Sequence, residues 1–146
     1  MDKSRTASSP SSIEESDLVQ SLSSFIRKLN DEEGALVVVE GLRDARALRR
    51  SGFSGDLFML CHNHQSFAKL EDMASRFKKV ILLLDNDSEG KKLVQRATRV
   101  LRGRARVDLF YQRALLPASR GKIRHVEELA PFSEIILSRK ISIPSP

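Results

Sequence analysis

The sequence predicts an α/β domain in which a four-stranded, mostly parallel β-sheet is flanked by helices. Three observations support this fold class. Four short segments have the length of strands, and two of them, 35–39 and 80–84, are continuous apolar runs, as expected of strands buried in a parallel sheet. They alternate with segments whose apolar residues recur every three or four positions, which is the helical period. The chain has 146 residues, of which 40% are hydrophobic, enough for one domain with a core.

The N-terminal part predicts a disordered leader followed by a helix. Residues 1–12 are rich in serine and contain Pro10, with few side chains to bury. Apolar residues then recur at helical spacing over residues 13–30, and Ser12 or Ser16 is a suitable N-cap. The continuous apolar run 35–39 is the first predicted strand.

The remaining core elements follow in alternation. Helices are expected at residues 43–51, 66–77 and 88–102, and strands at 56–60, 80–84 and 105–110. A single domain over residues 13–140 therefore has its core at 35–110 and a C-terminal extension at 111–140. In that extension we expect a loop at 115–121, a helical turn at 125–129, a helix at 131–137 and then a disordered tail at 141–146.

Charge and cysteine content restrict the environment and the partners. Residues 86–124 carry eleven basic and three acidic side chains, a local charge of +8, which favours a polyanion such as nucleic acid. An ordinary solvated basic surface is the alternative. Cys61 is the only cysteine, which suits a reducing compartment, and no apolar run is long enough to cross a bilayer. We therefore expect a soluble, cytoplasmic protein that does not bind membranes.

Acidic residues follow two of the predicted buried strands. Glu40 comes directly after the first strand, and Asp85 and Asp87 come after the third. In an open α/β sheet ligands bind outside the carboxyl ends of the strands, so these carboxylates are expected to converge there. Converging carboxylates repel one another unless a cation neutralises them, and oxygen ligands suit Mg²⁺. Helix capping is the structural alternative for Asp87.

Two glycines follow these acidic residues at the start of the next helices. Gly41 and Gly90 have no side chain, so the backbone there can approach a metal ion or a phosphate closely. The amide groups that open the helix at Ser88 are also suited to binding an anion.

The two motifs together resemble the Toprim domain. The first is a strand ending in Glu40-Gly41 with Asp44 three residues later, and the second is a strand ending in Asp85-x-Asp87-x-x-Gly90. The resemblance covers residues 35–110, and residues 125–131 are similar to a segment that closes several compact relatives. It implies a three-layer sandwich and places the chain beside primases, topoisomerases, recombination mediators and nucleases that include a ribosomal-RNA maturase.

The resemblance also implies roles for individual residues. Glu40 falls on the catalytic glutamate, and Asp85 and Asp87 fall on the metal-binding pair, with Glu40 as a further metal ligand. Asp44 and Glu89 match acidic positions that some members share. Many compact relatives carry lysine where this chain has Leu42, so Arg43 is the candidate phosphate contact in its place.

Other residues are candidates for contact with nucleic acid or metal. The basic residues of the predicted helix 88–102 favour a path for a nucleic-acid backbone, and the candidates are Lys91, Lys92, Arg96 and Arg99. Cys61, His62 and His64 offer three zinc donors, but no partner cluster accompanies them, so contact with substrate or a plain loop is the alternative. His125 is expected to be structural or to face the substrate.

These observations predict a Mg²⁺- or Mn²⁺-dependent phosphodiesterase, with an endonuclease as the leading hypothesis. The likeness to the compact maturase favours RNA over DNA. One alternative is a non-catalytic module that binds nucleic acid or docks on a replication or RNA-processing complex, and another is small primase-like nucleotidyl transfer. A protein partner or a homodimer remains open.

Overall fold

The computed structural model describes the backbone of residues 3–61 and 63–142 and the side chains of residues 15–61, 63 and 65–139. Its four strands form one sheet in the order β2-β1-β3-β4, and every neighbouring pair is parallel. The strands are β1 (Ala35–Val39), β2 (Asp56–Met59), β3 (Lys79–Leu82) and β4 (Arg106–Asp108). The prediction of a mostly parallel four-stranded sheet is confirmed.

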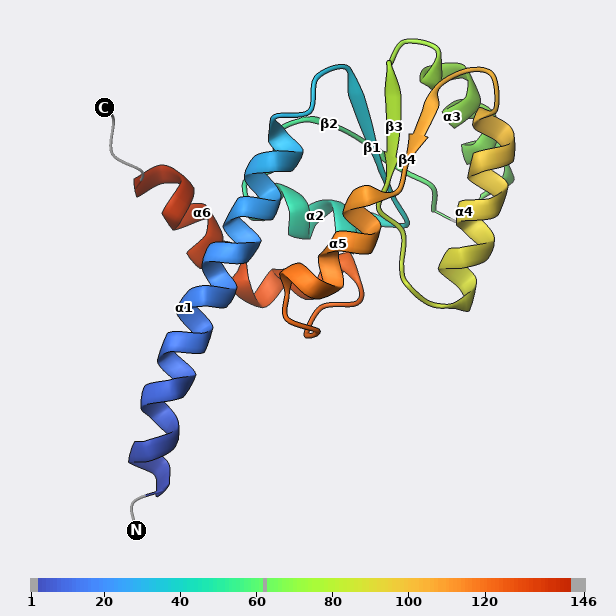
Figure 1. Cartoon of the computed structure of the whole chain (residues 1–146). Helices are drawn as coiled ribbons and strands as arrows, with labels where there is room; N and C mark the ends of the chain where they lie inside the picture. The colour runs from blue at the N-terminus through green and yellow to red at the C-terminus, as the bar shows by residue number, and fades with distance from the viewer. Residues whose placement is uncertain (1–2, 62, 143–146) are drawn as a thin grey trace.

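Helices cover both faces of this sheet. They are α1 (Lys3–Asn30), α2 (Leu42–Arg50), α3 (His64–Ala74), α4 (Ser88–Leu101), α5 (Phe110–Ala118), the 3₁₀ helix η1 (Val126–Phe132) and α6 (Ser133–Ser142). Figure 1 shows α3 and α4 on one side of the sheet and α1, α2, α5 and α6 on the other. The three-layer arrangement is therefore present. Within the described residues, no helix is both long and apolar enough to cross a membrane.

The central strand β1 divides its side chains between two hydrophobic cores. Val37 and Val39 pack with α1, α2, α5 and α6, whereas Leu36 and Val38 pack with α3 and α4. This division follows from the alternation of side chains along a strand. Every residue of β1 is buried, which explains why a continuous apolar run marks this strand in the sequence.

Helix α1 begins earlier than the sequence predicts. It starts at Lys3, inside the segment expected to be a disordered leader, and ends at Asn30 as expected. Leu22 and Leu29 are fully or almost fully buried and anchor its C-terminal half. A helix that is already formed extends without a further nucleation cost. The packed C-terminal turns therefore allow the preceding residues to join the helix. At the other end α6 reaches Ser142, and residues 143–146 of the expected tail lie outside the described residues.

The loop expected at residues 115–121 is wrong for residues 115–118, which are helical, whereas residues 119–121 form a turn. Helix α5 occupies Phe110–Ala118 because Tyr111 and Leu115, one turn apart, are both buried against the sheet and α1. Pro117 has no N–H to donate to the carbonyl of Arg113, so the last turn lacks one hydrogen bond, and the helix ends one residue later at Ala118. The helix ends where Arg120 and Gly121 adopt left-handed backbone conformations, with φ of 58° and 81°.

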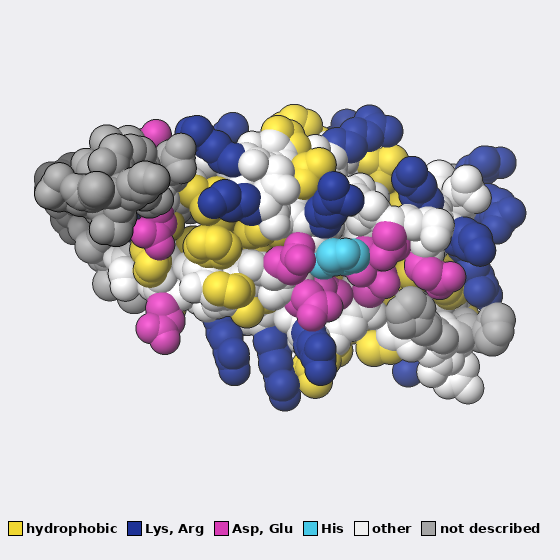
Figure 2. Space-filling model, turned by 90° about the horizontal axis from the view of Figure 1, so that it is seen from below, with side chains coloured by type: hydrophobic (Ala, Val, Ile, Leu, Met, Phe, Trp, Pro, Cys, Tyr) yellow, Lys and Arg dark blue, Asp and Glu magenta, His cyan; other side chains and the backbone are white. Residues whose placement is uncertain are grey.

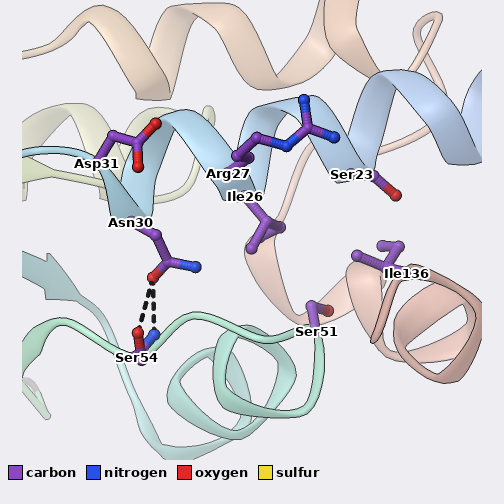
Figure 3. Close-up of a pocket in the computed structure, with 8 residues that line it drawn as sticks. All are labelled: Ser23, Ile26, Arg27, Asn30, Asp31, Ser51, Ser54 and Ile136. Carbon is purple, nitrogen blue, oxygen red and sulfur yellow. Dashed lines mark hydrogen bonds between the residues drawn. The ribbon is translucent and has the colours of Figure 1, made fainter. Parts of the chain in front are cut away.

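A cavity of about 240 Å³ lies between α1, α6 and the loop after α2 (Figure 3). Asn30 joins its walls, because its Oδ1 accepts a hydrogen bond from the Ser54 N–H at 2.8 Å and its Nδ2 donates to the Gly52 carbonyl at 3.0 Å. The hydroxyls of Ser23 and Ser51 are buried beside it without a hydrogen-bond partner in the described part of the chain. Asn30 thereby fixes the end of α1 to the end of α2.

A partly buried ionic network joins the start of β3 to the segment before β1 and to the end of β4. Lys79 Nζ lies 2.6 Å from Glu32 Oε1 and 3.0 Å from Asp108 Oδ2, and the Tyr111 hydroxyl donates to Glu32 Oε2 at 2.6 Å. The Lys79 hydrogen bond lowers the pKa of Glu32. Burial opposes ionisation of Asp108, but hydrogen bonds from the Phe110 N–H and from Lys79 bring its pKa below the usual value. The hydrogen bond to Glu32 raises the pKa of Lys79.

This network predicts acid-dependent stability. We expect Lys79→Met to lower the free energy of unfolding by about 2 kcal/mol at neutral pH, because two partly buried carboxylates lose their cation. Both carboxylates have folded-state pKa values below their unfolded values, so their contribution is present above about pH 4 and is lost as the pH falls through the folded values. Urea unfolding across this range should therefore show the gap between wild type and variant closing in acid. A constant gap would contradict the assignment.

Candidate metal centre

Acidic side chains gather at the carboxyl ends of β1 and β3. These strands are neighbours in the sheet, but the chain leaves β1 toward β2 on one side and leaves β3 toward β4 on the other. Such a topological switch point opens a crevice outside the strand ends, where ligands bind in α/β sheets. Figure 2 shows acidic side chains around a histidine on the face seen from below, with lysine and arginine side chains on both sides of them.

Glu40 connects the two strand ends. It is only 9% exposed, and its Oε2 accepts a hydrogen bond from the Asp85 backbone N–H at 2.8 Å. Burial raises the pKa of Glu40, and the nearby Asp85 and Asp44 carboxylates raise it further. The structure thus brings together Glu40 and Asp85, which are forty-five positions apart, as the sequence predicts. The catalytic role of Glu40 stays a prediction.

Asp85 lies at the centre of the cluster. Its Oδ2 is 3.0 Å from His125 Nδ1, and its side chain is 18% exposed. Its other oxygen, Oδ1, is buried and has no hydrogen-bond partner within the described part of the chain. A buried carboxylate oxygen without a partner is costly, so this atom is suited to a ligand.

Asp87 caps α4 and also lies close to the cluster. Its Oδ1 accepts a hydrogen bond from the Gly90 N–H at 2.7 Å, which is the capping role that the sequence left open. Asp85, Asp87 and His125 each offer one ligand atom, and these atoms all lie within 4.8 Å of one another. The converging group among the described residues is therefore this set, and Glu40 lies beside it, in contact with the backbone and the side chain of Asp85.

Two carboxylates hold the segment that carries His125. Glu128 Oε1 accepts hydrogen bonds from the backbone N–H groups of Arg124 and His125, at 2.8 and 3.0 Å, and these bonds lower the pKa of Glu128. Asp44 Oδ1 accepts from the Glu127 N–H at 3.0 Å, which joins α2 to η1. The Asp85 carboxylate, to which Nδ1 is hydrogen-bonded, raises the pKa of His125. The sequence missed this contact, and its only signal was the likeness of residues 125–131 to a closing segment.

Asp44 has a positioning role rather than a place in the converging group. Its second oxygen, Oδ2, accepts from the Gly41 N–H at 3.1 Å, so both oxygens hold backbone groups. Asp44 is 6% exposed, and this burial raises its pKa. Glu89, the other additional acidic candidate, is exposed in the first turn of α4 and is not in the converging group.

The two glycines differ in their surroundings. A Cβ added to Gly90 would overlap the carbonyl oxygen of Asp85, so protein packing requires this glycine. A Cβ on Gly41 would meet nothing within 4 Å, so the space beside it is open. At Gly90 the close neighbour is the Asp85 backbone, and at Gly41 there is room for a ligand. Close approach of either glycine to a metal ion or a phosphate stays a prediction.

The predicted basic contacts are mostly at the surface. Arg43 is exposed and lies 3.8 Å from Glu127, and Lys91, Lys92 and Arg99 are exposed on α4. Arg96 differs, because its guanidinium lies 4.3 Å from the centre of the Phe67 ring and covers that ring. Arg96 therefore contributes to packing between α3 and α4.

The zinc alternative falls partly outside the described residues. Cys61 is exposed and adopts a φ of 53°, whereas residue 62 and the side chain of His64 are outside the described part of the chain. The set that the structure does bring together has two carboxylates and one imidazole. Carboxylate oxygens suit Mg²⁺ and Mn²⁺, and an added imidazole is more usual for Mn²⁺ than for Mg²⁺.

His125 provides a test of this site. We expect His125→Ala to weaken Mn²⁺ binding by roughly 10–100-fold, because Asp85 loses the group that orients or joins it. In His125→Asn the amide nitrogen can replace Nδ1 as a donor, so partial recovery would indicate that His125 orients Asp85 rather than binding the metal. Titration of each variant with Mn²⁺, followed by electron paramagnetic resonance, measures both effects. Unchanged affinity in His125→Ala would remove His125 from the site.

Comparisons with known proteins show which family and which solved structure this chain is similar to. The sequence model of the Toprim domain family matches residues 35–129. A UPF0292 protein of Thermococcus gammatolerans is 38% identical over 106 residues, which is 72% of this chain and 77% of the relative. A UPF0292 protein of Archaeoglobus fulgidus is 32% identical over 110 residues, 75% of this chain and 85% of the relative. A solved structure of a protein from Aquifex aeolicus matches with a TM-score of 0.62 at 28% identity, covering 73% of this chain and 96% of that one.

Proposed function

This chain belongs to the Toprim domain family, with archaeal UPF0292 proteins as relatives, and on this basis we propose that it is a metal-dependent endonuclease that cleaves phosphodiester bonds of nucleic acid. RNA is the favoured substrate and DNA the second. The proposal combines the family, which is associated with metal-dependent nucleic-acid chemistry, with the cluster at the switch point of the sheet.

One observation carries the proposal. The Asp85 Oδ1 atom is buried without a hydrogen-bond partner in the described part of the chain, beside ligand atoms of Asp87 and His125. A cation would satisfy this oxygen and offset the repulsion between the carboxylates. Mg²⁺ or Mn²⁺ fits the oxygen-rich donor set, and Asp85 and Asp87 would hold it.

Each residue around the site has its own proposed role. A bound metal ion supplies charge stabilisation at a phosphate and activation of water. Asp85 and Asp87 place that ion, and His125 orients Asp85 through its Nδ1. Glu40, fixed by the Asp85 N–H, would accept or donate a proton next to it or become a further ligand. Asp44 and Glu128 hold the backbone that carries His125.

The second candidate is a module that binds nucleic acid without cutting it. The exposed basic residues of α2 and α4 favour it, because they would bind phosphates whether or not the acidic site is active. Catalysis needs Glu40 and the Asp85–Asp87 pair, whereas simple binding should survive the loss of Glu40. Primase-like transfer would instead require nucleotide-dependent synthesis on a template.

Cleavage of labelled nucleic acid tests the proposal. The full chain is incubated with structured RNA or duplex DNA in the presence of Mg²⁺, Mn²⁺ or a chelator, and the products are separated by size. We expect metal-dependent cutting, faster on RNA. The absence of cutting with both metals, together with salt-sensitive binding, would contradict the nuclease and favour the binding module.

A further inference from the structure

Helix α2 presents a row of arginines that begins at the metal centre. Its inner face is buried, whereas Arg43, Arg46, Arg49 and Arg50 are exposed. The only acidic residue of the helix, Asp44, is buried and bound to backbone groups. Apart from the exposed Leu42 at its first position, the outer surface of α2 is therefore positively charged, and the helix starts two residues after Glu40.

The four arginines are not equivalent. Arg49 is engaged within the protein, since its Nη1 donates to the carbonyls of Phe53 and Gly55 at 3.1 and 2.7 Å. Arg43 has a loose ion pair with Glu127 at 3.8 Å, and an exposed pair of this kind is weak and easily exchanged. Arg46 and Arg50 are exposed and are in none of the ion pairs between the described side chains.

Three of these arginines share a groove with η1. Arg43, Arg46 and Arg50 line it together with Ala47, Glu127 and Ala130. From Arg43 to Arg50 the helix advances about 10 Å, so the guanidinium groups are spread along the groove rather than gathered at one point. No aromatic side chain lines the groove, so it has no platform on which bases would stack. Its chemistry fits a sugar–phosphate backbone.

We propose that the groove between α2 and η1 holds the backbone of the nucleic acid as it leaves the metal centre, with Arg46 and Arg50 contacting successive phosphates. This inference rests on the proposed function and adds the path of the substrate. Glu127, whose backbone N–H is bound by Asp44, links the groove to the segment that carries His125. Because the contacts are to phosphates, binding along this groove is independent of base sequence.

The test compares three charge-reversed forms of the full chain. They are Arg46→Glu with Arg50→Glu in the groove, Lys92→Glu with Arg99→Glu on α4, and Arg76→Glu with Lys78→Glu just before β3, at the sheet edge opposite the metal centre. Fluorescence anisotropy with two structured RNAs of unrelated sequence, in chelator and over a range of salt, gives the dissociation constants. We expect the α2 pair to bind both RNAs at least about tenfold more weakly, with a salt slope reduced by about two. The Arg76 and Lys78 pair should bind nearly as wild type.

A second assay distinguishes failure of the groove assignment from failure of the proposed nuclease function. Hydrolysis of bis(para-nitrophenyl) phosphate reports on the acidic site alone, and we expect the α2 pair to retain it. Equal RNA affinity in wild type and the α2 pair would overturn the groove assignment even if the nuclease is real. An equal loss of RNA affinity in the Arg76 and Lys78 pair would also overturn it. So would an α2 pair that keeps its RNA affinity and loses only its affinity for vesicles of anionic lipid. If neither wild type nor any variant hydrolyses a phosphodiester, but the α2 pair still binds RNA more weakly than wild type, the proposed nuclease function is wrong and the groove assignment is supported.

Discussion

Asp85→Asn is expected to reduce metal-dependent cleavage by at least about a thousandfold, because it removes the carboxylate at the centre of the cluster. Asparagine keeps the shape of the side chain and an oxygen that can accept from His125, so the fold should be retained. The Oδ1 atom that is buried without a partner becomes part of a neutral amide, which holds a divalent cation poorly. Initial cleavage rates at saturating Mg²⁺ or Mn²⁺ measure this loss.

Glu40→Gln separates catalysis from metal binding. Glutamine can still accept the hydrogen bond from the Asp85 N–H, so the strand ends stay joined and the metal should still bind. We expect cleavage to fall by about a hundredfold or more while Mn²⁺ affinity changes little. Asp72→Asn, the same chemical change at an exposed position of α3, is the control and should act as wild type. Full activity in both Asp85→Asn and Glu40→Gln would place the chemistry elsewhere.

Gly90→Ala is expected to destabilise the protein by about 2–4 kcal/mol and to disturb the metal centre as well. The added Cβ would overlap the Asp85 carbonyl oxygen and lie 2.7 Å from its carbonyl carbon. Both atoms belong to the backbone, which cannot turn aside as a flexible side chain can. Relief requires α4 or the Asp85 segment to move, and this segment carries the carboxylates that we propose to bind the metal. The free energy of unfolding in urea and the Mn²⁺ affinity are the two measurements.

Gly41→Ala is the matched control for Gly90→Ala. Gly41 has an extended backbone, with φ of −153°, and open space where a Cβ would go. We expect a stability change within about 1 kcal/mol, mainly from a poorer helix cap. A loss at Gly41 as large as the loss at Gly90 would show that the overlap with Asp85 is not the cause.

The fold was largely predictable because its strands are buried on both faces. The apolar run 35–39 has the same limits as β1. A central parallel strand is buried on both faces and contains no polar residue, so its ends are clear in the sequence. Helix α5 was missed because Pro117 and Gly121 suggest a loop, whereas the burial of Tyr111 and Leu115 decides the matter. Burial by distant elements is a tertiary effect, and local composition does not report it.

The candidate site was predictable where it depends on strand ends. Glu40 and Asp85 meet because β1 and β3 are neighbouring parallel strands, and their apolar runs mark both ends. His125 was not assigned to the metal centre, because η1 reaches Asp85 only through the tertiary hydrogen bonds of Asp44 and the packing of α2. The hydrogen bond from the Glu127 N–H to Asp44 could not be predicted for the same reason, since Glu127 is far away in the sequence.

Direct measurement of metal binding tests the central claim, that Asp85 and Asp87, with His125 beside them, form a divalent-cation site. Isothermal titration of the full chain with Mn²⁺, and then with Mg²⁺, is compared between wild type and Asp85→Asn, with circular dichroism to show that both are folded. We expect saturable binding by wild type and at least about a tenfold weaker affinity in the variant. Failure of folded wild type to bind either ion, or equal binding by both forms, would contradict the claim.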